Sequence, residues 1–221
     1  MDIYEDIRTN LLMGHAKEVK ALVEKALALR YPPESILQDG LILGVEMLSY
    51  KFRTSSVSVP EALMATRALN MGLKAVTPFL KVSQKPHSCR AIIGTVEGDL
   101  HDIGKNLVKT YVSTLGIEVV DLGVDVSKEE FAQAVIKWKP QLVMISALLL
   151  TTVDEIREVI QELKRQNLRK DVVIFVGGLP VTPELAREAG ADYYSQDALE
   201  LRNFLDKNLE KILKVKKSNK S

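Results

Sequence analysis

One stretch of the sequence, residues 89–106, CRAIIGTVEGDLHDIGKN, decides the fold of the chain. Its first part, from Cys89 to Thr95, is an apolar run with the length of a buried strand. Its second part combines glycines, two aspartates and a histidine, and the sequence behind it predicts a helix over Lys105–Leu115. A buried strand, a polar loop and a helix in this order begin a βαβ unit, in which ligands bind at the loop that follows the strand.

The remainder of the chain repeats this order of short apolar strand and amphipathic helix. We predict further strands at Glu118–Leu122, Leu142–Ser146, Val172–Val176 and Ala191–Tyr194, each followed by a helix, at Ser127–Trp138, Thr152–Gln166, Thr182–Ala189 and from Asp197 onward. Such alternation predicts an α/β fold, a parallel sheet with helices on both faces. Five strands fit the doubly wound, flavodoxin-like (Rossmann-like) order 2-1-3-4-5, which places a ligand at the carboxyl ends of the strands.

Residues 1–86 follow a different pattern, because their apolar side chains recur at intervals of three and four, which predicts helices. Gly14 separates the first two helices, Pro33 begins a third, and Pro60 begins a fourth that runs to about Leu80. Four helices with short connections predict a four-helix bundle. We therefore expect a helical domain at residues 1–86, an α/β domain at residues 87–221, and a linker at Lys81–Ser88.

The composition excludes several classes of protein. Lys and Arg total 30 and Asp and Glu total 29, so the net charge of +1 argues against a nucleic-acid binder held by phosphate contacts. The one cysteine, Cys89, excludes a disulfide framework, and we expect its thiol to be buried and unreactive. No apolar run has the length of a membrane span, and the acidic N-terminus differs from a secretion signal. A cytoplasmic protein without a nucleic-acid or membrane partner is expected.

The loop of residues 98–106 allows three interpretations. A phosphate loop is disfavoured, because five residues separate Gly98 from Gly104 and Asn106 stands where a Ser or Thr would bind magnesium. A metal site is the second interpretation, with His101 as ligand and Asp99 as the hydrogen-bond acceptor of its other ring nitrogen. One protein ligand is too few for a bare zinc ion, but it suffices for a metal held by a macrocycle. The third interpretation is an ordinary surface histidine.

Several motifs together resemble one protein family. Asp99-x-His101-x-x-Gly104 resembles the cobalamin-binding motif of corrinoid proteins, and Ser146–Thr152, SALLLTT, resembles their Ser-x-Leu segment, with Leu150 where the family often has Thr. Val176-Gly177-Gly178 resembles their glycine pair, and Val59–Leu69, VPEALMATRAL, resembles the cap helix of the methyl-carrying branch. Over roughly residues 1–210, the chain thus resembles methyltransferase cognate corrinoid proteins and the corresponding region of methionine synthase.

The resemblance implies a role for each matching residue. His101 would replace the nucleotide base of cobalamin as the lower axial ligand of cobalt, and Asp99 with Thr152 would relay a proton to that ligand. The groove for the detached nucleotide tail would be lined by Ser146 and Leu148 and by the glycine pair. The implied cofactor-binding residues are Gly98, Asp99, His101, Asp102, Ile103, Gly104, Ser146, Leu148, Thr152, Gly177, Gly178 and, from the cap helix, Met64.

Structural explanations exist for the same residues. Thr152 could be a helix N-cap with Glu155 completing a capping box, and Gly177-Gly178 could be a strand-to-helix turn. In the cap helix, one face is expected to carry Met64, Ala68, Met71 and Ala75, which could lie against the corrin or belong to the core.

The implied function is that of a methyl carrier without catalytic residues of its own. A donor-specific methyltransferase would deliver a methyl group to Co(I), giving methyl-Co(III), and an acceptor methyltransferase would pass it to tetrahydrofolate or a thiol. A reductive activase is the third implied partner. The methyl donor is left open among methanol, methylamines, quaternary amines and methoxyarenes. Three alternatives are a cobalamin-dependent mutase subunit, a cobalamin sensor, and a flavodoxin-like domain that uses FMN or a phospho-aspartate.

Overall fold

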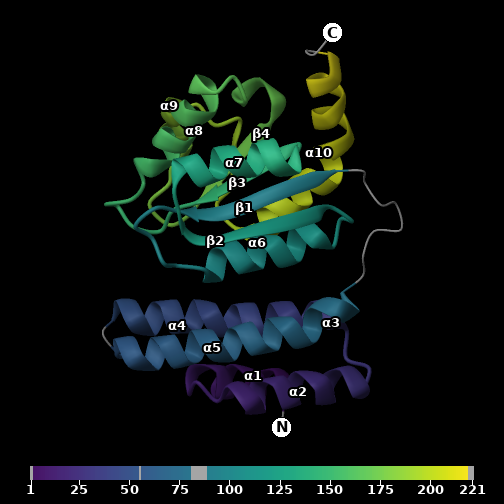
Figure 1. Cartoon of the computed structure of the whole chain (residues 1–221). Helices are drawn as coiled ribbons and strands as arrows, with labels where there is room; N and C mark the ends of the chain where they lie inside the picture. Colours follow the sequence, from purple (N-terminus) through teal and green to yellow (C-terminus); the bar gives the residue numbers. More distant parts are fainter. Residues whose placement is uncertain (1, 55, 81–88, 219–221) are drawn as a thin grey trace. The chain divides into compact units, whose positions relative to one another are not determined.

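A computed structural model describes residues 2–54, 56–80 and 89–218 of the chain. The chain divides into two compact units, Met1–Lys81 and Val82–Ser221, which Figure 1 shows as a helical part and an α/β part. The predicted linker, Lys81–Ser88, and the predicted domain boundary within it lie outside the described residues. Among the described residues, no helix is both long and apolar enough to cross a membrane.

The helical unit contains the four predicted helices. They are α1 (Ile3–Leu12), α2 (Ala16–Ala28), the uninterrupted series α3 (Pro33–Ser35), η1 (Ile36–Ile42) and α4 (Leu43–Arg53), and α5 (Val59–Val76), with a 3-10 turn η2 (Thr77–Phe79) behind it. Gly14 has a φ of 73°, which ends the first helical stretch. Ser58 and Glu61 form a capping box that begins α5. The segment η1 is π-helical, which the apolar pattern did not predict.

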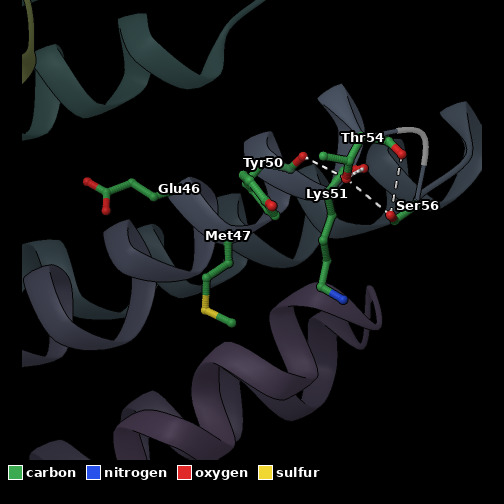
Figure 2. Close-up of a pocket in the computed structure, with 6 residues that line it drawn as sticks. All are labelled: Glu46, Met47, Tyr50, Lys51, Thr54 and Ser56. Atoms are coloured by element: carbon green, nitrogen blue, oxygen red, sulfur yellow. Dashed lines mark hydrogen bonds between the residues drawn. The ribbon is translucent and has the colours of Figure 1, made fainter.

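The core of the helical unit comes from the predicted apolar positions, including Ile7, Leu11, Val19, Leu41 and Leu69. Of the residues expected on one face of α5, Ala68 is fully buried in the core, whereas Met64 is 49% exposed and is not part of that core. Helix α4 and the residues that follow it in the chain form an open pocket of about 420 Å³, which is lined by Glu46, Met47, Tyr50, Lys51, Thr54 and Ser56 (Figure 2).

The α/β unit is a five-stranded sheet with the order β2-β1-β3-β4-β5, all neighbours parallel, which confirms the predicted topology. The strands are β1 (Arg90–Val96), β2 (Glu118–Val126), β3 (Leu142–Ser146), β4 (Val173–Gly177) and β5 (Tyr193–Tyr194). The helices are α6 (Ile103–Ser113), α7 (Lys128–Trp138), α8 (Glu155–Arg165), η3 (Arg169–Asp171), α9 (Pro183–Ala189) and α10 (Ala198–Ser218).

Alternate residues of β1 enter separate hydrophobic cores on the two faces of the sheet. Ile92 packs into the core that receives side chains of α7, α8 and α9, including Phe131 and Ile156. Ile93 packs into the other core with side chains of α6 and α10, including Val112 and Leu205. Both faces of the sheet are therefore covered, as the continuous apolar strands predicted. The carboxyl ends of the strands remain for a ligand.

Candidate functional site

The candidate site lies at the carboxyl ends of β1, β3 and β4. Thr95 of β1 pairs with Ser146 of β3, which in turn pairs with Gly177 of β4, so the three strands end at the same level of the sheet. The ends of these strands, the loops that follow them and the start of α6 carry all the predicted site residues of the α/β unit. The parallel topology thus brings together motifs that lie far apart in the sequence.

Asp99 and His101 form the centre of the site. The Oδ1 atom of Asp99 lies 2.6 Å from Nδ1 of the His101 imidazole and also accepts the backbone N–H of His101 at 3.0 Å. Asp99 is fully buried, whereas the His101 side chain is 50% exposed. Because an ionised carboxylate only accepts hydrogen bonds, the proton of a neutral imidazole lies on Nδ1. The lone pair of Nε2 is then free for a ligand.

The second carboxylate oxygen of Asp99 is also held by the protein. Its Oδ2 accepts the backbone N–H of Leu148 at 2.6 Å and the hydroxyl of Thr152 at 3.2 Å. Burial by itself would raise the pKa of Asp99, but the N–H groups of Leu148 and His101 and the imidazole of His101 outweigh it and lower the pKa below its ordinary value. Asp99 is therefore ionised near neutral pH and orients the imidazole.

The capping role considered for Thr152 is wrong. Helix α8 begins at Glu155, its N-cap residue is Asp154, and no capping side-chain hydrogen bond is present there. Thr152 lies in the preceding turn, where its carbonyl accepts the N–H of Glu155 while its hydroxyl donates to Asp99. A tertiary hydrogen bond thus replaces the local one that the Thr-x-x-Glu pattern predicted.

Two further residues hold the loop and carried no recognisable signal in the sequence. Thr95 is fully buried, and its hydroxyl donates to the carbonyl oxygen of His101 at 2.9 Å. Asp125, near the end of β2, accepts the N–H of Gly98 at 2.7 Å. Asp125 could have been predicted as a partner of this loop only if the neighbour of β1 and the register of their pairing had been known.

The other residues of the motif begin α6. Asp102 is the N-cap residue of this helix and Ile103 its first residue. Gly104 is exposed, and a Cβ atom added there would meet no other part of the protein within 4 Å. Lys105 is buried and its ammonium lies 2.7 Å from Asp121 of β2, so this lysine is neutralised within the protein. The ion pair is a further argument against a phosphate loop.

The glycine pair at the end of β4 has a role within the protein itself. Gly178 has a φ of 131°, and a Cβ atom there would overlap the carbonyl oxygen of Ala147. At Gly177, an added Cβ would lie 2.9 Å from the carbonyl oxygen of Ser195. These contacts support the strand-to-helix turn that was considered for the pair. A contact with a nucleotide tail stays a prediction for both glycines, as it does for Ser146 and Leu148. A contact of Met64 with the corrin ring stays a prediction too, and Met64 lies in the helical unit.

Exposed leucines lie in the loops that follow β1, β3 and β4. Leu100 follows β1, Leu150 follows β3 and Leu179 follows β4, and their exposed fractions are 72%, 81% and 74%. Apolar side chains gathered at one edge of a sheet indicate a surface that binds an apolar partner or ligand. Within the described residues, no group of three His, Cys, Asp or Glu side chains could hold a metal ion. A metal bound at His101 would therefore need other ligands.

These features define a class: an α/β binding protein for a macrocycle-held metal, preceded by a four-helix bundle. Two family models, both described as a B12 binding domain, match residues 89–201 and residues 3–77. Trimethylamine corrinoid protein 2 of Methanosarcina mazei is 36% identical over 80% of this chain and 82% of its own. The chain belongs to this family of cobalamin-binding corrinoid proteins.

Solved structures agree with this assignment. The monomethylamine corrinoid protein of Methanosarcina barkeri matches with a TM-score of 0.81 and 29% identity over 92% of this chain and 97% of that one. The methanol:cobalamin methyltransferase complex of the same organism contains a chain that matches with a TM-score of 0.51 and 25% identity over 92% of this chain and 78% of that one.

The residues present fit cobalamin, the cofactor of the family. His101 offers Nε2 to a metal, the open space at Gly104 lets a large ring approach the start of α6, and the exposed leucines suit the apolar parts of a macrocycle.

Proposed function

We propose that the chain is a methyl carrier that binds cobalamin in the base-off/His-on form, with Nε2 of His101 as the lower axial ligand of cobalt. The observation that carries this proposal is the contact of 2.6 Å between a fully buried carboxylate, Asp99, and Nδ1 of a half-exposed imidazole. The contact holds the tautomer whose free nitrogen can bind a metal and raises the basicity of that nitrogen.

The protein controls this ligand through a proton. Asp99 in its ionised form draws the Nδ1 proton of His101 toward itself, which makes Nε2 a stronger donor. The Thr152 hydroxyl, on the other oxygen of Asp99, extends the chain of hydrogen bonds and provides the second site at which a proton can enter or leave. The donor strength of His101 therefore follows the protonation of the Asp99–Thr152 relay.

The other residues of the site would accommodate the cofactor. We assign the groove for its nucleotide tail to Ser146, Leu148 and the glycine pair, and the face beside the ring to Gly98, Asp102, Ile103 and Gly104. Met64 would contact the ring from a cap domain at residues 1–86, with the cobalamin-binding domain at residues 87–221. The assignments in the α/β unit follow the motifs at the ends of β1, β3 and β4, and that of Met64 follows the resemblance of α5 to a cap helix.

Bound cobalamin would supply a cobalt atom that accepts a methyl group from one partner and gives it to another. The chain would then act as a carrier subunit between a donor-specific methyltransferase and an acceptor methyltransferase for tetrahydrofolate or a thiol, with a reductive activase as a third partner. A methylamine is the favoured donor, because the similar proteins are named for trimethylamine and monomethylamine. The match to a methyltransferase complex supports a partner enzyme as the site of donor binding.

Reconstitution with cobalamin tests the mode of binding. The wild-type chain is expected to bind cobalamin with the visible spectrum of a histidine-ligated form, and His101→Ala is expected to lose that spectrum. Asp99→Asn should weaken histidine ligation about 10- to 100-fold, as is typical when the hydrogen-bond partner of a metal ligand is removed. His15→Ala is the control, since His15 is an exposed residue of the helical unit. An unchanged spectrum in His101→Ala would contradict the assignment.

Methylation by purified partners tests the donor. We expect the reconstituted chain to accept a methyl group from a methyltransferase specific for mono-, di- or trimethylamine, and more slowly from one specific for methanol. Mass spectrometry of the extracted cofactor measures the methylated fraction. Methylation by the methanol enzyme alone would rule out the methylamine assignment.

A further inference from the structure

The strand next to the histidine loop is irregular where it passes the loop. Strand β2 pairs with β1 through Gly94 and Gly123 and again through Val96 and Val126. Between these two pairs β1 advances by two residues and β2 by three, so β2 contains a bulge. Bulges are rare between parallel strands, and near functional sites they redirect a side chain.

The bulge places Asp125 in an unusual conformation. Its φ is 56°, in the left-handed region, which Asp and Asn adopt more readily than most residues other than glycine. The Asp125 side chain is exposed. A left-handed backbone conformation is costly for a residue other than glycine, and it persists only when the surrounding structure holds it. Residues in this conformation therefore occur often at functional sites.

Asp125 forms hydrogen bonds on both sides of Asp99. Its Oδ1 accepts the N–H of Gly98 at 2.7 Å, and its own N–H donates to the carbonyl oxygen of Asp99 at 3.0 Å. One residue of β2 therefore holds two peptide groups of the loop, the one between residues 97 and 98 and the one between residues 99 and 100. The position of the Asp99 carboxylate in turn decides where the imidazole of His101 lies.

We infer that Asp125 is a positioning residue for the cobalt ligand, which acts on His101 through the backbone of Gly98 and Asp99. This inference rests on the proposed function, in which His101 binds cobalt. The hydrogen bonds of Asp125 go to the backbone of Gly98 and Asp99 and not to the imidazole, so its role is to fix the loop before the cofactor binds. A loop fixed in advance loses less conformational entropy when the ligand bond forms.

Two substitutions separate the side-chain acceptor from the backbone conformation. Asp125→Asn keeps an oxygen acceptor and tolerates the left-handed region, whereas Asp125→Gly keeps only the backbone conformation. Lys139→Gly is the matched control, because Lys139 also has a left-handed φ, 47°, but lies at the end of α7, before β3, at the opposite edge of the sheet. In all three variants the new residue, Asn or Gly, tolerates the left-handed backbone conformation of the residue that it replaces. Each variant is therefore expected to fold.

The first measurement is amide hydrogen exchange at Gly98, read by NMR in the chain without cobalamin. We expect Asp125→Gly to exchange about tenfold faster than wild type, since one hydrogen bond is lost. Asp125→Asn and Lys139→Gly are expected to stay near the wild-type rate. The second measurement is the visible spectrum after reconstitution with cobalamin, in which Asp125→Gly should show a smaller histidine-ligated fraction than Asp125→Asn.

Two results would overturn the inference. One is an Asp125→Gly variant that matches Lys139→Gly in both measurements, and the other is an Asp125→Asn variant as impaired as Asp125→Gly. Failure of the proposed function is recognised separately, since wild type would then bind cobalamin without the histidine signature. In that event the inference falls with it, while the exchange rate at Gly98 still reports whether Asp125 holds the loop.

Discussion

At the scale of single residues, the site depends on a carboxylate that is both buried and charged. An isolated charge of this kind would be costly, so a buried Asp persists as an ion only when its oxygens are hydrogen-bonded. Asp99 has two N–H donors, one hydroxyl and one imidazole around its two oxygens. The donors belong to the loop after β1 and to the loop after β3. The hydrogen bonds to Asp99 therefore also connect these two loops.

The buried thiol of Cys89 makes the stability of the folded chain depend on pH in the alkaline range. Burial raises the pKa of its thiol from 9.0 to about 12. The folded chain retains the thiol proton more strongly than the unfolded chain, so the stabilising effect is complete below pH 9 and is lost as the pH rises toward 12. Between pH 9 and 10, the free energy of unfolding of wild type should fall by about 1 kcal/mol more than that of Cys89→Ala.

Denaturant unfolding of both chains at the two pH values measures this difference. Cys89→Ala serves as the reference because it lacks the thiol but retains every tyrosine and lysine that ionises in the same range. Equal losses in the two chains would contradict a buried, protonated thiol.

Sequence reasoning identified some residues of the site and missed others for a physical reason. Asp99 and His101 are separated by one residue, so their contact could be predicted from local geometry. The hydroxyl of Thr95 and the carboxylate of Asp125 contact the backbone of the loop, and backbone groups are the same in every sequence. The donor to Asp99 from residue 148 is likewise a backbone N–H. Such contacts follow from the register of the strands, which one sequence does not reveal.

At the scale of elements, the start of α6 is the most informative segment. Gly104 has open space around it and no left-handed φ, so the fold itself does not need a glycine there. In a helix, alanine is favoured over glycine by up to about 1 kcal/mol. We predict that Gly104→Ala raises the free energy of unfolding without cobalamin by up to about 1 kcal/mol, yet weakens cobalamin binding about tenfold, since an added methyl group would overlap the cofactor.

Denaturant unfolding and titration with cobalamin measure the two effects separately. Ser113→Ala, at the last residue of the same helix, is the control and should bind cobalamin like wild type. Gly178→Ala provides the contrast, because overlap with Ala147 should destabilise the fold itself. Unchanged cobalamin affinity in Gly104→Ala would show that the ring does not approach this residue.

The elements themselves were predicted well where periodicity alone decides them. Strand β3 was predicted with its observed bounds, and Gly14 and Pro33 were correctly placed at the end and the start of helices. The π-helical segment η1 was not predicted, because its apolar spacing is that of an α-helix. There Gly40 lies against Ile7 of α1, a tertiary contact that the apolar pattern does not reveal. The bulge of β2 was missed for the same reason, since it depends on its neighbour β1.

At the scale of the whole molecule, each unit has apolar residues enough for a core of its own. Leu41 is fully buried in the helical unit and Ile156 in one of the two cores of the sheet. The single tryptophan of the chain, Trp138, packs against the core that contains Ile156. Tryptophan fluorescence therefore reports on the α/β unit, whereas far-UV circular dichroism reports on the helices of both.

Two substitutions test whether the units unfold separately. Replacing a fully buried Leu or Ile with Ala costs about 2–5 kcal/mol, and the loss is confined to the core that contains the residue when the cores are independent. We predict that Leu41→Ala lowers the denaturant midpoint of part of the circular dichroism signal and leaves the fluorescence midpoint unchanged. Ile156→Ala should do the reverse and shift the fluorescence midpoint. If Leu41→Ala moves both signals equally, the two units unfold as one cooperative structure.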